Sequence, residues 1–175
     1  ALPIGSVIEK NINDEGAVAD TIRQVVSQSK CKLKDAAVAV AGSSVITKLI
    51  DMPAGMDEDA LEAQITIEAD QYIPFPLDEV SIDFEVIGPI EGNSEQVKVL
   101  LAACRRENVE LRANVLENSG LHPKVVDVEA YTIERAYTLI SQGWVDYANP
   151  LVAIIDIGAT MMTLSVLLNG QTVYT

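Results

Sequence analysis

Aromatic residues, cationic residues and long hydrophobic runs are all scarce in this chain of 175 residues. Aromatic residues make up only 5%, so few side chains are present on which the bases of single-stranded nucleic acid could stack. The formal net charge of −14 opposes binding to a phosphate backbone. No apolar run reaches the roughly 18 residues of a membrane span. We therefore expect neither a nucleic-acid partner nor a direct membrane span.

Histidine and cysteine are rare as well, with one histidine, His122, and two cysteines, Cys31 and Cys104. The cysteines lie far apart and share no metal-ligand spacing. The lack of a disulfide framework is typical of a cytoplasmic protein. With a single histidine and no recognisable nucleophile motif, a Ser-His-Asp catalytic centre is not expected.

The residues that are present predict a folded α/β chain, since 49% are hydrophobic. Asp14 is a typical cap for a helix that runs to about Ser29, with Val18, Ile22 and Val25 on one apolar face. Residues 36–41 predict a short buried strand of Val and Ala. These elements are typical of one part of an α/β sheet.

A separate pattern occupies residues 44–129 and predicts a β-α-β-β-α-β module of the ferredoxin-like kind. Asp57 caps its first helix, which we expect to reach Ile73 with Leu61, Ile65 and Tyr72 on its buried face. The expected strands are 45–52, 80–87, 97–103 and 124–128, and the second helix is 107–118. The predicted core contains Leu61, Ile65, Phe84, Val99 and Leu116.

The α/β pattern resumes after this module. A helix over 130–141 is expected to bury Ile133, Tyr137 and Ile140, and residues 146–150 form a linker. The apolar runs 151–155 and 162–168 predict two strands, and Asn169-Gly170 predicts a hairpin turn into a third. The module at 44–129 is therefore predicted to be an insertion.

The end of the first of these strands carries the most informative motif, in which Asp156 is followed by Gly158, Ala159 and Thr160. Gly158 lets the backbone approach a ligand closely, and successive N–H groups in such a turn can bind phosphate oxygens. Asp156 is placed to hold Mg²⁺ through water. The alternative is a strand that simply leads into a tight turn, because the motif is short.

Several strings, taken together, resemble those of the PilM family of type IV pilus assembly proteins, within the FtsA-type branch of the actin-like ATPases. They are AAVAVAGS at 36–43, EADQYIP at 68–74, LLAACR at 100–105, VVDVEAY at 125–131 and DIGAT at 156–160.

The resemblance implies a partial actin-like ATPase domain of the ribonuclease H-like class, interrupted by an FtsA-type 1C subdomain that is SHS2-like. It assigns residues 1–43 to subdomain 1A, 44–129 to 1C, 130–149 to a helix of 1A and a linker, and 150–175 to the first strands of 2A. The family's first phosphate motif and its adenosine-binding loops are not found here. We therefore expect a fragment that alone binds no cofactor and is inactive.

The resemblance also implies a function, namely an ATP-binding scaffold with at most slow ATPase activity. In the full-length protein it assigns Mg²⁺ to Asp156 and the phosphates of ATP to Gly158, Ala159 and Thr160. It implies a cytoplasmic location at the inner-membrane face, among pilus inner-membrane assembly proteins. It implies binding of the N-terminal peptide of PilN in a groove between 1A and 1C. The residues expected near that groove are Gly42, Ser43, Ser44, Val45, Val128 and Glu129.

Other functions remain open at this point. An FtsA-like cell-division adaptor would need an amphipathic membrane helix, and a sugar-kinase-like enzyme would need a catalytic acid over a hydroxyl substrate. A stand-alone ferredoxin-like binding domain is a further alternative, because a fold alone does not determine function. The apolar strands at 151–155 and 162–174 also predict self-association, since unpaired strand edges invite another chain.

Overall fold

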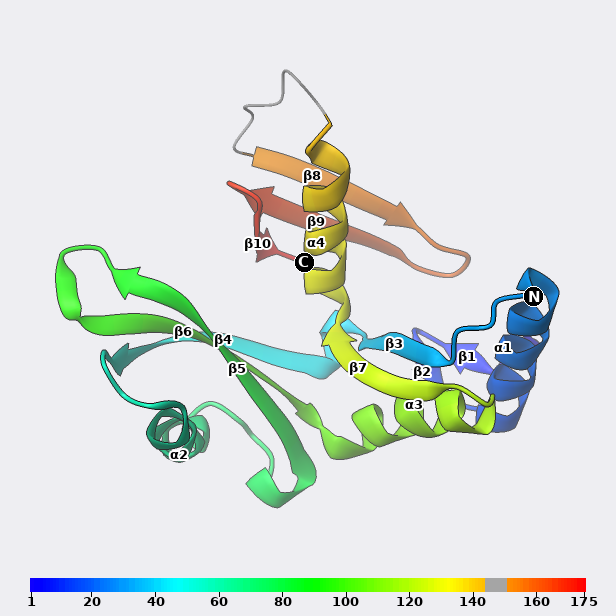
Figure 1. The fold of residues 1–175 in the computed structure, drawn as a ribbon, viewed down its shortest axis with the longest axis horizontal. Helices are drawn as coiled ribbons and strands as arrows, with labels where there is room; N and C mark the ends of the chain where they lie inside the picture. Colours follow the sequence, from blue (N-terminus) through cyan, green and yellow to red (C-terminus); the bar gives the residue numbers. More distant parts are fainter. Residues whose placement is uncertain (144–150) are drawn as a thin grey trace. The chain divides into compact units, whose positions relative to one another are not determined.

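The computed structural model describes residues 1–143 and 151–175, which form two compact units (Figure 1). The first unit contains Ala1–Gly42 and Glu110–Thr175, and the second contains Ser43–Val109. Both units combine helices with strands, so the predicted mixed α/β class is confirmed. In sequence, the second unit is one continuous segment between the two segments of the first.

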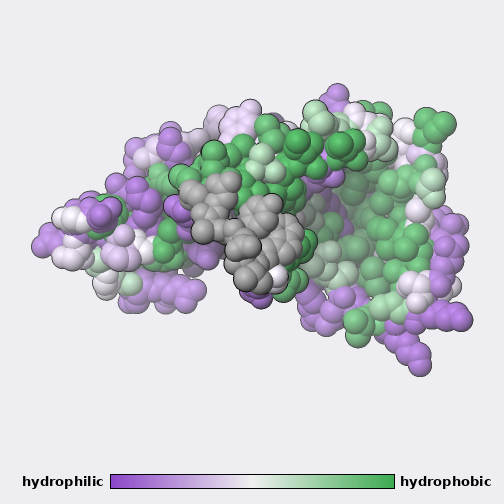
Figure 2. All heavy atoms as spheres, turned by 90° about the horizontal axis from the view of Figure 1, so that it is seen from above, coloured by the Kyte–Doolittle hydropathy of each residue, from purple (hydrophilic) through white to green (hydrophobic). Residues whose placement is uncertain are grey.

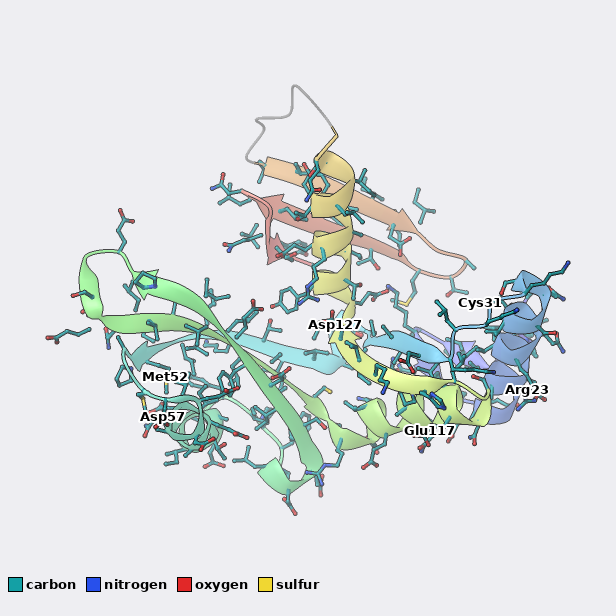
Figure 3. The ribbon with its side chains drawn as sticks, in the orientation of Figure 1. Arg23, Cys31, Met52, Asp57, Glu117 and Asp127 are labelled. Atoms are coloured by element: carbon teal, nitrogen blue, oxygen red, sulfur yellow. The ribbon has the colours of Figure 1, made fainter. Side chains whose placement is uncertain are left out.

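The second unit is a three-stranded antiparallel sheet with one helix on it. Strands β4 (Val45–Pro53), β6 (Asn93–Arg105) and β5 (Val80–Ile90) lie in that order, and helix α2 (Glu58–Ala69) packs against the sheet (Figure 1). Figure 3 labels Met52 on β4 and Asp57 at the start of α2. The core contains, among others, Ile50, Met52, Leu61, Ile65, Ala69, Val99 and Leu101, with Phe84 packed against it.

Helix α2 begins where the sequence predicts but ends earlier. A side-chain oxygen of Asp57 accepts a hydrogen bond from the Ala60 N–H at 2.9 Å, which is the expected N-cap. The helix ends at Ala69 instead of Ile73, because the chain tightens into turns there: the N–H groups of Gln71 and Tyr72 donate to the carbonyl oxygens of Glu68 and Ala69, three residues back. Ile73 is still buried, but Tyr72 is exposed, contrary to the prediction.

The last strand of the expected six-element module belongs to a different sheet. Strand β7 (His122–Val128) pairs in parallel with β3 (Asp35–Val40), with Val38 opposite Val126. This pairing corrects the prediction that β7 joins β4, β5 and β6. Alternation of side chains identifies a strand but carries no information about its partner. The compact second unit consequently ends at Val109, not at residue 129.

Helix α3 (Arg106–Asn118) begins in the second unit and continues into the first. Leu116, which was predicted in the core of the inserted module, is buried in the first unit. Its neighbour Val115 packs with Val18 and Ala19 of helix α1 (Glu15–Ser29). Asp14 caps α1 as predicted, through a 2.9 Å bond from the Ala17 N–H. Val25 of the predicted stripe is exposed.

The remaining strands of the first unit form two small antiparallel arrangements. Strands β1 (Val7–Ile8) and β2 (Asn11–Ile12) make a hairpin. Strands β8 (Leu151–Ile157), β9 (Met162–Leu168) and β10 (Gln171–Tyr174) form a sheet in the order β10-β9-β8. The predicted turn at Asn169-Gly170 is confirmed, with φ of 52° and 82°.

Helix α4 (Glu129–Ser141) packs against this last sheet (Figure 1). Glu134 Oε2 accepts a hydrogen bond from the Thr172 N–H at 2.6 Å. Ile140 is exposed, although it was predicted to be buried. The predicted linker at 146–150 lies outside the described residues.

Candidate functional site

The Asp-x-Gly-x-Thr motif forms a closed turn between β8 and β9. The Gly158 N–H donates to the carbonyl oxygen of Met161 at 2.9 Å. A Cβ built on Gly158 would lie 2.9 Å from that same oxygen, which is closer than real Cβ atoms approach. The turn itself therefore requires glycine here, which agrees with the plainer of the two interpretations of the motif. A ligand is not needed to explain this residue.

The same hydrogen bond limits what the turn can offer to a phosphate. Because the Gly158 amide is already used, the donors that remain are those of Ala159 and Thr160. Both residues are exposed, and within residues 1–143 and 151–175 no protein acceptor is bonded to either amide. Asp156 is also exposed, and no ion pair involves it in the described part of the chain. The amides of Ala159 and Thr160, the hydroxyl of Thr160 and the carboxylate of Asp156 are thus available to a ligand.

A lysine on the β1–β2 hairpin reaches this sheet. Lys10 Nζ donates to both carboxylate oxygens of Glu129, at 2.8 and 2.9 Å, and to Thr163 Oγ1 at 2.9 Å. Thr163 lies directly opposite Asp156 in the β8–β9 ladder. Opposed residues on antiparallel strands have Cβ atoms roughly 4.5–5.5 Å apart on the same face. The ammonium group of Lys10 therefore lies beside the strand position that carries Asp156.

Lys10 also occupies an unusual backbone conformation. The two turn residues of the β1–β2 hairpin, Glu9 and Lys10, have φ of 49° and 65°. Such turns favour Asn-Gly, because a side chain in this region costs roughly 1–2 kcal/mol per residue. Contacts with Glu129, Thr163 and Arg112 hold Lys10 in this conformation.

A buried arginine is hydrogen-bonded to the same hairpin. Arg112 on α3 is only 4% exposed, and its Nε donates to the Ala39 carbonyl oxygen at 2.9 Å. Its Nη2 donates to the Lys10 carbonyl oxygen at 3.1 Å. An arginine is almost never buried unless its donors are satisfied, so these carbonyls fix its position. In turn, Arg112 ties the strained hairpin to strand β3.

A pocket of about 340 Å³ lies next to these groups, within the first unit. Apolar side chains of β1, β2, α1, β3 and α3 form most of its lining, and Lys10, Arg112 and Glu129 supply the charges. The apolar lining residues are Val7, Ile12, Val18, Ile22, Val38, Ala39, Ala41, Val115 and Leu116.

Sequence reasoning missed the contact of Lys10 with Thr163, which lies opposite Asp156, and the bond from Arg112 to Lys10. One signal for Arg112 was present, because it stands three and four residues before Val115 and Leu116 on the apolar face of a predicted helix. An arginine at such a position indicates a buried, hydrogen-bonded cation. Lys10 and Thr163 carry no comparable signal, since their contact depends on pairing between segments far apart in sequence.

The six residues expected near a partner groove are divided between the units. Gly42 ends the first segment of the first unit, while Ser43, Ser44 and Val45 begin the second unit. Val128 and Glu129 stand where β7 leads into α4, next to Asp127 (Figure 3). The Asp127 carboxylate accepts the Val128 N–H at 2.7 Å and pairs with Arg135 of α4. This contact fixes the start of the helix that carries Glu129.

Metal-ion clusters and membrane-spanning helices are both absent from the described part of the chain. No group of three or more His, Cys, Asp or Glu side chains is arranged there to hold a metal ion. No helix in residues 1–143 and 151–175 is long and apolar enough to cross a membrane.

Known proteins that are similar to this chain identify its family. A family model described as type IV pilus assembly protein PilM matches residues 1–175. The solved PilM-PilN type IV pilus biogenesis complex is similar to this chain at 28% identity and a TM-score of 0.78. That match covers 98% of this chain and 50% of the solved chain, so this chain spans half the length of that relative.

A second solved structure is the cytoplasmic domain of EpsL, an inner-membrane component of the type II secretion system of Vibrio cholerae. It matches at 17% identity and a TM-score of 0.46, over 62% of this chain and 42% of its own. The likeness to the PilM structure and the match of the family model over the whole chain carry the assignment. The partial actin-like α/β fold is confirmed, and the chain belongs to the PilM family of type IV pilus assembly proteins.

Proposed function

We propose that this chain is part of an ATP-binding actin-like scaffold of the type IV pilus inner-membrane assembly complex, and that it recruits the cytoplasmic N-terminal peptide of PilN. The observation that carries this proposal is the similarity, over 98% of the chain, to a solved PilM in complex with PilN. The scaffold would act on the cytoplasmic side of the inner membrane and be held there through its partner.

The nucleotide part of the proposal is supported by the groups at the β8–β9 turn. The unused amides of Ala159 and Thr160 suit phosphate oxygens, and the exposed Asp156 carboxylate suits the water shell of Mg²⁺. Bound Mg-ATP would supply the phosphates and a divalent cation, and the role of this chain would be to orient them. One turn cannot enclose a triphosphate, so we expect residues 1–175 alone to bind ATP weakly and to hydrolyse it slowly at most.

The partner part of the proposal places the PilN peptide near Gly42, Ser43, Ser44, Val45, Val128 and Glu129. Peptides bind folded domains by adding a strand to a sheet edge or by laying apolar side chains into a groove. Strand β4 begins at Val45 and is an edge strand of the β4-β6-β5 sheet, so its open edge suits the first of these modes.

The experiment is a titration of a fluorescently labelled N-terminal peptide of the cognate PilN, followed by anisotropy. We compare the unmodified protein with Ser43→Trp, and with Ser94→Trp at the start of β6 as a matched control, since both serines are exposed. Ser43→Trp should weaken binding by about tenfold or more, as expected for a blocked contact centre, and Ser94→Trp should not. Equal affinity of all three proteins, or no binding by the unmodified one, would contradict the proposal.

A further inference from the structure

The phosphate motif of this chain has donors and an acid but no cation of its own. Residues 151–175 contain no lysine, arginine or histidine. Nucleotide triphosphates carry several negative charges, and proteins that bind them combine backbone amides with cationic side chains and a metal ion. A nucleotide site at Asp156 and Thr160 therefore needs a positive side chain from another segment.

Lys10 is placed to be that side chain. Its ammonium group lies 2.9 Å from Thr163 Oγ1, and Thr163 stands opposite Asp156 in the β8–β9 ladder. The side chain of Lys10 is mostly buried, at 26% exposure, as is that of its partner Glu129 at 29%. A lysine held in this way keeps its charge within a small volume beside the turn, where ionic interactions are less screened than in bulk water.

The backbone conformation of Lys10 also favours a role in ligand binding. Lys10 stands at a left-handed turn position where glycine is the usual residue, with φ of 65°. Buried Arg112 binds its carbonyl oxygen at 3.1 Å and so holds the strained turn in place. A strained residue that the surrounding structure fixes on several sides is a feature of binding and catalytic sites.

We propose that Lys10 is a phosphate-binding residue of the nucleotide site, with Glu129 as its partner in the absence of nucleotide. In this assignment the ammonium group donates to an oxygen of the terminal phosphate when Mg-ATP binds at the β8–β9 turn, and gives up part of its bond to Glu129. The assignment deepens the proposed function and rests on it, because it presupposes that Asp156 and Thr160 face a nucleotide.

The test is calorimetric titration of Mg-ATP, Mg-ADP and adenosine into the complete reading frame that contains residues 1–175. Lys10→Met removes the charge at nearly constant length, and Lys10→Arg keeps it. Lys10→Gly removes the charge while relieving the positive-φ strain, so it separates loss of phosphate binding from loss of stability. Lys98→Met is the matched control, since Lys98 pairs with Asp51 in the second unit. A melting curve for each variant establishes that it is folded.

We expect Lys10→Met and Lys10→Gly to weaken Mg-ATP binding by about tenfold, the effect of one lost charge-assisted hydrogen bond. Adenosine binding should not change, and Lys10→Arg and Lys98→Met should bind Mg-ATP like the unmodified protein.

If Lys10→Met and Lys10→Gly bind Mg-ATP normally, the assignment is overturned while the proposed function stands. If Lys10→Arg loses as much affinity as Lys10→Met, the charge is not what matters, and the assignment is also overturned. If the unmodified protein binds no ATP, both the proposed function and the assignment of Lys10 are overturned.

Discussion

At the scale of single residues, Arg112 illustrates how one buried cation organises its surroundings. Its guanidinium group bonds the carbonyl oxygens of Ala39 and Lys10, which belong to a strand and a hairpin far apart in sequence. Removing a charged donor from a buried position leaves those acceptors without their partner. The position of Lys10 beside the β8–β9 turn therefore depends on Arg112.

We expect Arg112→Met to lower the free energy of unfolding by roughly 2–4 kcal/mol, which is the range for losing a buried charged donor with several hydrogen bonds. Urea denaturation followed by circular dichroism measures this change. Arg106→Met at the exposed start of the same helix is the control and should stay within about 0.5 kcal/mol. A loss below about 1 kcal/mol for Arg112→Met would mean that water replaces its donors at little cost.

The N-cap of α2 gives a second prediction at this scale. Asp57 accepts the Ala60 N–H at 2.9 Å, so Asp57→Ala leaves a helix-terminal donor without its protein acceptor. The expected loss is about 1 kcal/mol. Asp59→Ala in the same turn removes a carboxylate without a capping bond and should cost about 0.3 kcal/mol. Equal losses of unfolding free energy in the two variants, measured by urea denaturation, would show that the capping bond is not the cause of the loss.

At the scale of secondary-structure elements, strand and helix positions followed from the sequence better than strand pairing did. The caps at Asp14 and Asp57 and the turn at Asn169-Gly170 are local, and each was confirmed. The partner of β7 was not predictable, because the choice between two sheets depends on contacts across the whole chain. The same reason explains why Leu116 was assigned to the wrong core.

The candidate site was predictable to a similar extent. The motif at Asp156, Gly158 and Thr160 is a local pattern, whereas its neighbours Lys10 and Thr163 come together only in the folded unit. The sequence also could not reveal that the Gly158 amide is used within the turn. That detail depends on where the carbonyl group of Met161 points.

The corrected position of Leu116 leads to a prediction about local stability. Ile65→Ala should speed hydrogen exchange of amides in β4, β5 and β6, because Ile65 packs in the core of the second unit. Leu116→Ala should instead speed exchange in α1 and in the Glu110–Asn118 part of α3. Each substitution should cost about 2–5 kcal/mol. If Leu116→Ala selectively sped exchange in β4 to β6, the result would support the original prediction that Leu116 packs in the core of the inserted module.

At the scale of the whole molecule, the exposed face of the β8–β9 sheet is the main feature that needs a partner. Opposed pairs on this face are Leu151 with Leu168, Ile155 with Leu164 and Ile157 with Met162, and all six side chains are exposed. Figure 2 shows hydrophobic residues gathered beside the grey ones, in the region of this sheet. An apolar sheet face of this kind is typical of an interface.

We expect a protein consisting of residues 1–175 alone to self-associate through this face. Light scattering after size exclusion should give a mass above the 18.8 kDa of one chain. Replacing the opposed pair by Ile155→Glu and Leu164→Lys should restore the monomer, since opposite charges across a strand pair preserve the pairing. Val25→Lys on α1, where the apolar side chain is also exposed, should leave the mass unchanged. A monomer whose amides at 151–174 exchange slowly would show that this apolar face is stable in contact with water.

Calorimetry with Mg-ATP tests most directly the proposal that the β8–β9 turn binds nucleotide. The complete reading frame containing this chain should bind Mg-ATP, and Asp156→Ala should weaken that binding by about tenfold or more, because it removes a carboxylate from the water shell of the metal. Asp83→Ala, an exposed acid on β5, is the control and should bind normally. Unchanged affinity in Asp156→Ala, or no binding by the unmodified protein, would contradict the account.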